Sequence, residues 1–90
     1  MNDKKNDKNN LYRAIMHPGT LKILKILRES PMNFNDIMFE SKISPSVLDR
    51  LLKQLTNRNF VSKRNGKYFL TEKGEILATL LEKVFELIQH

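Results

Sequence analysis

The sequence predicts a mainly α-helical domain that includes one small antiparallel β-hairpin and ends in a long helix. Two short amphipathic segments are separated by about three residues, Lys42 to Ser44, as in a pair of consecutive helices. An Asn65-Gly66 pair lies between two strand-like runs, and Asn-Gly favours a hairpin because a type I′ turn needs φ > 0 at both central positions. Apolar residues then recur at helical spacing towards the end of the chain.

The N-terminal segment differs in composition from the rest of the chain. Residues 1–10 are Met, Asn, Asp and Lys only, so we expect a disordered tail there and one domain at 11–90. A core of this size is small, and the chain contains no cysteine that could form a disulfide. A partner subunit is therefore the natural source of additional burial.

The first helices of the domain are bounded by Pro and Gly. The run Leu11–Met16 is expected to end before Pro18-Gly19, and Thr20 is predicted to cap a second helix that reaches Glu29. Apolar residues cover most of the circumference of this second helix, which is typical of a buried scaffold. These residues are Leu21, Ile23, Leu24, Ile26 and Leu27.

The next two segments are predicted to form a helix-turn-helix. Asn33 can cap a helix that runs to about Ser41, and Ser44 followed by Pro45 is a strong start signal for a helix that reaches Arg58. The apolar face of the second helix consists of Val47, Leu48, Leu51, Leu52 and Leu55. Its opposite, polar face consists of Ser46, Asp49, Arg50, Lys53 and Asn57.

The last third of the chain is predicted to be a hairpin followed by a helix. Asn59 tolerates the left-handed conformation that ends a helix, and strand-like runs then cover residues 60–64 and 67–70. Thr71 is expected to cap the last helix, for which we expect the bounds 71–90.

The net charge of +6 is concentrated in the centre of the chain. Residues 42–67 contain seven basic residues and one acidic residue, whereas the remainder contains nine of each. The seven are Lys42, Arg50, Lys53, Arg58, Lys63, Arg64 and Lys67. A localised positive field favours a polyanion, most commonly nucleic acid; the alternative is an ordinary solvated surface.

These patterns assign candidate DNA contacts to the second helix of the motif and to the hairpin. A major groove admits one helix, so Ser46, Asp49 and Arg50 are expected near base edges, with Arg50 suited to guanine. Asp49 could instead orient Arg50. The residues expected near phosphates at this helix are Lys42, Lys53 and Asn57, and Ser44 is a further expected DNA contact. Those expected to reach flanking backbone or minor groove from the hairpin are Lys63, Arg64, Asn65, Gly66 and Lys67. For each residue alone, a solvated surface position is the alternative.

The stretch from residue 14 to 83 resembles the archaeal and bacterial winged helix-turn-helix regulators, most closely the arsenic-repressor-like group. The matching segments are His17-Pro18, residues 21–24, 43–55, 60–61, 63–68 and 70–74. The resemblance implies that the helix from Pro45 enters the major groove, that the hairpin is the wing, and that a short strand near Met32 pairs with it. Thr20, Asp49 and Asn59 depart from the usual arginine, small polar residue and glycine, and the cysteine or histidine clusters of metal-sensing members are missing.

The last helix is predicted to mediate homodimer formation. Nine of the thirteen residues from Ile76 to Ile88 are apolar, which is too many for a helix that packs on one side only. One row has the 4-3-4 spacing of a coiled-coil seam: Leu77, Leu81, Val84 and Ile88. A second row is Ile76, Leu80 and Leu87, and Phe85 widens the face. The alternative is that all of these apolar side chains pack into the small core of the same chain.

The preferred function is therefore sequence-specific binding of double-stranded DNA as a transcriptional regulator, with repression expected and a cytoplasmic, nucleoid-associated location. A protein-interaction module within a larger nucleic-acid complex is the alternative, and RNA binding is third because an exposed aromatic pair for base stacking is missing. His17 and His90 are too isolated for a metal site, and we expect no cofactor, catalytic activity or membrane partner. No separate sensing domain is evident, so any effector would bind this domain or its dimer interface.

Overall fold

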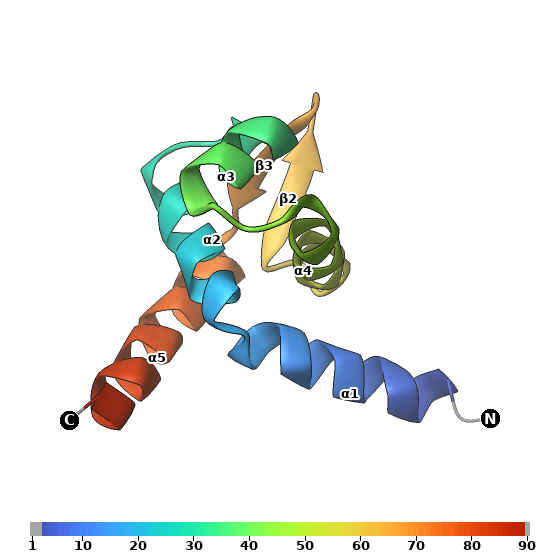
Figure 1. Cartoon of the computed structure of the whole chain (residues 1–90), viewed down its shortest axis with the longest axis vertical. Helices are drawn as coiled ribbons and strands as arrows, with labels where there is room; N and C mark the ends of the chain where they lie inside the picture. The colour runs from blue at the N-terminus through green and yellow to red at the C-terminus, as the bar shows by residue number, and fades with distance from the viewer. Residues whose placement is uncertain (1–2, 90) are drawn as a thin grey trace.

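The computed structural model describes the backbone of residues 3–89 and the side chains of residues 8–89. Within the described backbone, five helices and three short strands follow one another (Figure 1). Their bounds are α1 Asp3–Met16, α2 Pro18–Glu29, β1 Met32–Asn33, α3 Phe34–Ser41, α4 Pro45–Asn57, β2 Val61–Arg64, β3 Lys67–Leu70 and α5 Glu72–Gln89. The predicted class, mainly α with a small antiparallel sheet and a long final helix, is confirmed. Residues 1 and 2 of the predicted tail (1–10) lie outside the described backbone, and so does residue 90 of the predicted last helix (71–90).

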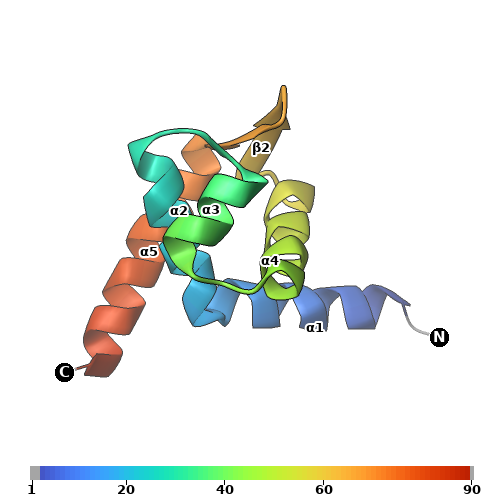
Figure 2. The same ribbon diagram turned by 45° about the horizontal axis from the view of Figure 1, so that its top comes forward.

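α1 begins well before the position that the sequence predicts. Residues 3–10, which we expected to belong to a disordered tail, have helical backbone. Leu11 and Ala14 are buried where α1 packs on α4, and they anchor the helix. Once a helix is nucleated, each added residue gains one hydrogen bond, and Asn, Asp and Lys cost only about 0.7 kcal/mol or less relative to Ala. In Figures 1 and 2, α1 runs beneath α4 and extends past it.

The start of α2 differs from the prediction that Thr20 caps it. The helix begins at Pro18, and His17 is the N-cap, whose Nδ1 accepts a hydrogen bond from the Gly19 amide at 2.9 Å. Thr20 is fully buried inside the helix, and its hydroxyl donates to the carbonyl of Ala14. Pro is favoured at the first helical position because it lacks the N–H that would have no partner there, so the start shifts towards the N-terminus.

The helix-turn-helix consists of α3 and α4, as the sequence predicts. The Asn33 side chain accepts a hydrogen bond from the Asp36 amide at 2.8 Å, which confirms the predicted cap of α3. Lys42 ends α3 in the left-handed conformation, at φ 61°. Ser44 occupies the N-cap position of α4, but its hydroxyl makes no cap hydrogen bond. The fixed φ of Pro45 therefore defines the start of α4 without the expected side-chain cap.

The three strands form one antiparallel sheet in the order β1-β3-β2. Asn65 and Gly66 both have positive φ, 53° and 79°, which confirms the predicted hairpin turn. Asn59 has φ 64°, as expected of a residue that ends a helix. Met32 in β1 pairs with Tyr68 in β3, so the short strand implied by the resemblance is present.

The hydrophobic core lies between α2, α3, α4, α5 and the sheet. Its largest fully buried apolar side chains are Ile23, Leu24, Ile37, Leu48, Leu51, Leu52, Leu55 and Val61. α5 starts against the hairpin at Gly74, where an added Cβ would lie 2.0 Å from the carbonyl oxygen of Phe60. The Thr71 hydroxyl accepts from the Gly74 amide at 2.9 Å, which confirms Thr71 as the cap of α5. Within residues 3–89, no helix is long and apolar enough to cross a membrane.

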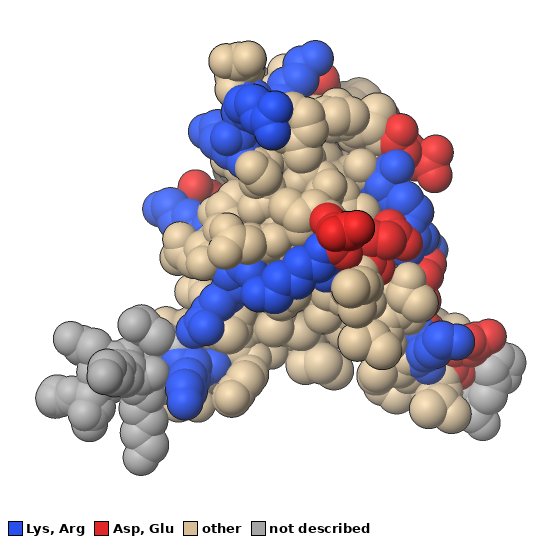
Figure 3. All heavy atoms as spheres, turned by 180° about the vertical axis from the view of Figure 1, so that it is seen from behind, with Lys and Arg blue, Asp and Glu red and all other residues tan. Residues whose placement is uncertain are grey.

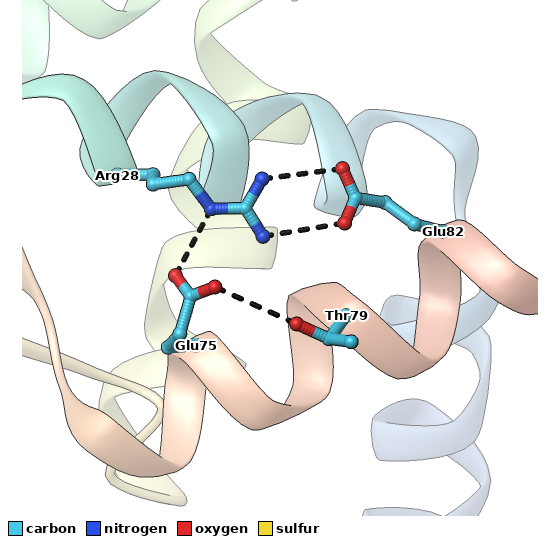
Figure 4. Close-up of polar contacts among 4 residues, drawn as sticks. All are labelled: Arg28, Glu75, Thr79 and Glu82. Carbon is cyan, nitrogen blue, oxygen red and sulfur yellow. Dashed lines mark hydrogen bonds and ion pairs between the residues drawn. The ribbon is translucent and has the colours of Figure 1, made fainter.

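An ion-pair cluster joins α2 to α5 at the edge of this core (Figure 4). The Arg28 guanidinium donates to Glu75 at 3.0 Å and to both carboxylate oxygens of Glu82 at 3.1 and 3.3 Å. These hydrogen bonds raise the pKa of Arg28, and the hydrogen bond to Glu75 has a larger effect than those to Glu82. The hydrogen bond from Arg28 lowers the pKa of Glu82. The cluster therefore adds polar contacts to the apolar packing of α5 on α2.

Candidate nucleic-acid interface

α4 presents a continuous polar face to solvent. Its leucines are buried in the core, and at about 100° per residue this burial turns the other side of the helix outwards. The exposed residues on that side are the predicted base and phosphate contacts Ser46, Asp49, Arg50, Lys53 and Asn57. The packing of the core thus determines which side chains α4 offers to a ligand.

Asp49 pairs with Lys53, one helical turn later, and not with Arg50. Its Oδ2 lies 3.0 Å from the Lys53 Nζ, and both side chains are more than half exposed. A solvated pair at this spacing is worth about 0.3–0.5 kcal/mol, so an incoming phosphate can displace the carboxylate from Lys53. The alternative that Asp49 orients Arg50 therefore does not match the structure.

Arg50 lies at the side of α4 that is closest to α1. It lines a cleft together with Arg13 and His17, which the sequence does not predict as neighbours of the DNA-contact residues. Only the packing of α1 on α4 brings these residues together, since they are far apart along the chain. A second hollow lies beside α2, and it is lined by Leu21, Ile26, Met32 and charged residues of both signs.

The hairpin tip is basic, and aromatic side chains support two of its cations. The Lys63 Nζ lies 5.2 Å from the centre of the Tyr68 ring, and the guanidinium of Arg64 lies 5.1 Å from that of Phe69. Exposed cation–π contacts of this kind contribute about 0.5–1 kcal/mol and restrict the side chain. The sequence does not reveal these contacts, although the alternation of charged and aromatic residues on paired strands could have indicated them. Lys67, Asn65 and Gly66 are exposed at the tip.

The turn before α4 adds further polar groups next to the helix. Lys42 and Ser44 are both exposed, and the Lys42 Nζ lies 5.4 Å from the centre of the exposed Phe39 ring. The Lys22 Nζ donates to the carbonyl of Ser41 at 3.2 Å and so ties the turn to α2. The predicted residues of the turn and of α4 are thus brought to one region of the surface.

Basic and acidic side chains are distributed unequally over the molecule. Seen from behind, basic side chains cover the hairpin tip and recur near the start of α1 (Figure 3). Most of the acidic side chains in this view lie on the half that contains α5. Residues 42–67, which include α4 and the hairpin, contain seven basic residues and one acidic residue, so the surface that they form is suited electrostatically to a polyanion.

The predicted dimer residues of α5 divide into two groups. Leu81 is 3% exposed and belongs to the core of the chain itself, while Leu77 and Phe85 are partly buried against that core. The prediction that Leu81 belongs to the dimer seam is therefore wrong, because its side chain is not accessible to a second subunit. The other predicted residues are exposed: Leu80 (55%), Val84 (37%), Leu87 (79%) and Ile88 (69%), together with Ile76 (61%). These five form the exposed apolar row of α5.

Comparisons with known proteins agree with this arrangement. The sequence profile of the winged helix-turn-helix family matches residues 20–89. An uncharacterized protein of Methanocaldococcus jannaschii is 32% identical over 66 residues, which are 73% of this chain and 31% of that protein. The chain thus spans less than a third of this relative.

Two further relatives from the same organism are named as uncharacterized HTH-type transcriptional regulators. One is 28% identical over 71 residues, which are 69% of this chain and 66% of the relative. The other is 27% identical over 81 residues, which are 84% of this chain and 76% of the relative.

Proposed function

The chain belongs to the winged helix-turn-helix family, and from this premise we propose that it regulates transcription by sequence-specific binding of double-stranded DNA. One observation carries the proposal: the polar face of α4 and the basic hairpin tip are both exposed beside the same core, with cations that aromatic rings support. The names of two relatives as transcriptional regulators support the same process. Repression is the mode of regulation that we propose.

In the proposed complex, α4 enters the major groove and the hairpin contacts the flanking backbone or minor groove. A groove about 12 Å wide admits one helix, and Ser46 and Arg50 lie early enough in α4 to reach base edges. Lys53 and the hairpin cations Lys63 and Arg64 then bind phosphates. These contacts position the protein, while Arg50 contributes sequence preference.

We propose that two copies pair through the exposed apolar row of α5. A two-fold pairing is self-complementary, so each subunit buries the same row and presents its own α4. Recognition helices in such dimers lie about 34 Å apart, which is one turn of DNA. The expected binding site is therefore an inverted repeat.

A selection from random duplex DNA at a defined salt concentration tests the proposal. We expect enrichment of an inverted repeat, and log K should fall with log salt by about 0.9 for each phosphate that a cation neutralises. A variant in which Lys63, Arg64 and Lys67 are all replaced by Gln should give a shallower slope. If the unmodified protein did not bind duplex at low salt, the DNA-binding function would be refuted.

A protein-interaction module is the second candidate, and the exposed apolar row of α5 favours it. Ile76, Leu87 and Ile88 are each more than half exposed, and such residues commonly bind another protein. Replacing this row with polar residues should then abolish partner capture and leave duplex affinity per subunit unchanged. Duplex binding that depends on Arg50 would instead favour the DNA-binding function.

A further inference from the structure

The cleft between α1 and α4 has the composition of an anion site. It encloses about 450 Å³, and its lining residues are Asn10, Arg13, Ala14, His17, Arg50 and Leu51. We infer that it binds a small organic anion, a carboxylate or a phosphate ester with an apolar body, and that this ligand competes with DNA for Arg50. The competition with DNA rests on the proposed function, whereas the binding of the anion does not.

The donors in the cleft come from both helices. Arg13 lies on α1 and Arg50 lies on α4, and two guanidinium groups can bind one oxyanion through paired N–H donors. His17 adds a further donor: its Nδ1 accepts from the Gly19 amide, so the neutral ring has its proton on Nε2. The amide of Asn10 is a fourth polar group. Among residues 8–89, whose side chains the structure describes, no acidic residue lines the cleft.

The base of the cleft is apolar. Ala14 and Leu51 are 4% and 1% exposed, and they separate the charged rim from the hydrophobic core. Small-molecule sites typically enclose about 300–1,000 Å³ and combine an apolar lining with a few polar groups. An anion with an apolar body fits this composition better than a bare inorganic ion does. The hollow beside α2 differs, because Lys22 and Lys25 are balanced there by Glu29 and Glu40.

Arg50 couples the cleft to the DNA-binding face. It belongs to the polar face of α4 and also lines the cleft, and one guanidinium cannot bind a ligand oxyanion and a guanine edge simultaneously. A ligand in the cleft should therefore lower the affinity for the specific DNA site. Because linkage is reciprocal, DNA should lower the affinity for the ligand by the same factor.

Phenyl phosphate is a suitable probe, with phenol as its uncharged counterpart. We expect amide NMR shifts near Arg13 and Arg50 on titration of the DNA-free protein with phenyl phosphate at constant ionic strength, and none with phenol. Arg13→Gln should weaken this binding about tenfold, because it removes charge-assisted hydrogen bonds. Lys8→Gln is the matched control, because it removes the same charge from the same helix at an exposed position that does not line the cleft. This variant should bind phenyl phosphate with the affinity of the unmodified protein.

Three outcomes would overturn the inference. The first is an absence of phenyl phosphate binding at constant ionic strength, and the second is an equal loss in Arg13→Gln and Lys8→Gln. The third is a loss of DNA affinity in Arg13→Gln when the unmodified protein binds no free anion. This result would identify the cleft as a contact for a DNA phosphate. The probe titration contains no DNA, so its result is independent of whether the proposed function holds. Phenyl phosphate that weakens specific DNA binding only when Arg13 is present would support the competition.

Discussion

Arg50 differs from the other polar residues of α4 in its surroundings. Ser46 and Asn57 face solvent, and Lys53 has a carboxylate partner in Asp49, whereas Arg50 lies beside Arg13 and His17. The neighbouring positive charge favours an anionic or electron-rich partner for Arg50 over water. This environment supports its assignment to readout of a guanine edge.

Replacing Arg50 with Ala should weaken binding to the specific site by about 1–3 kcal/mol and relax the preference at one base pair. Competition of specific and random duplexes against a labelled site measures both effects. Asn57→Ala is the control, since Asn57 lies near the end of α4 and should change affinity without changing the preferred sequence. Equal losses on specific and random DNA for Arg50→Ala would contradict the assignment to base readout.

The hairpin is the element whose contribution should be independent of sequence. Lys63 and Arg64 rest on aromatic rings, and the tip residues are exposed, so these cations can meet phosphates with little loss of side-chain freedom. Phosphate contacts fix the position of a protein on DNA but do not distinguish bases.

The double change Arg64→Ala and Lys67→Ala should therefore weaken all duplexes similarly and reduce the salt slope by about 1.8, because each phosphate that is no longer neutralised lowers the slope by about 0.9. Salt titrations of specific and random duplexes provide the measurement. The control removes the same charge from α2 and α5, through Lys25→Ala and Lys83→Ala, and should leave the slope unchanged. A change in the preferred sequence would show that the hairpin reads bases.

At the junction of α2 and α5, stability should depend on pH through Glu82. Its pKa is lowered in the folded protein by Arg28, so the folded state binds a proton less readily than the unfolded chain does. The stabilisation is present above the unfolded pKa of about 4.3 and is lost as pH falls through the lower, folded value.

Urea denaturation at pH 7 and at pH 3 measures this contribution. Glu82→Gln should lower stability at pH 7 and should differ less from the unmodified protein at pH 3, because pH 3 lies below the unfolded pKa of Glu82 and the ionic contribution is smaller there. Glu86→Gln on the same helix is the control, because Glu86 is exposed and does not belong to the Arg28 cluster of Figure 4. An equal effect of Glu82→Gln at both pH values would contradict an ionic contribution.

At the scale of the whole molecule, α5 is both part of the core and a free surface. Ala78 and Leu81 are buried against the domain, while Leu80 and Leu87 face away from it. The small core leaves a large apolar area in water, which is the usual condition for association.

Changing Leu80 and Leu87 together to Glu should produce a folded monomer with much weaker DNA binding, because the exposed row is disrupted and the core is intact. Sedimentation equilibrium and circular dichroism measure assembly and folding separately. Leu81→Glu is the contrasting variant and should unfold the chain, since it places a charge in the core. A single 10.6 kDa species of the unmodified protein at micromolar concentration would exclude the dimer.

The local features of this protein follow from its sequence. The cap at Asn33, the turn at Asn65-Gly66 and the cap at Thr71 each depend on residues within about four positions of one another, so the sequence is sufficient to predict them. The concentration of positive charge in residues 42–67 is likewise a property of composition, and it predicts a polyanionic partner without reference to the fold.

Other features were decided only when distant elements packed together. Helical spacing identified too many apolar residues on α5, but only the contact with α2 determined that Leu81 is buried and that Leu80 is exposed. The ion pairs of Arg28 join residues 47 and 54 positions apart, and the cleft at Arg50 exists because α1 crosses beneath α4. Periodicity specifies how side chains are arranged around one helix, whereas the choice of face depends on the free energy of burial against neighbours that the local sequence does not contain.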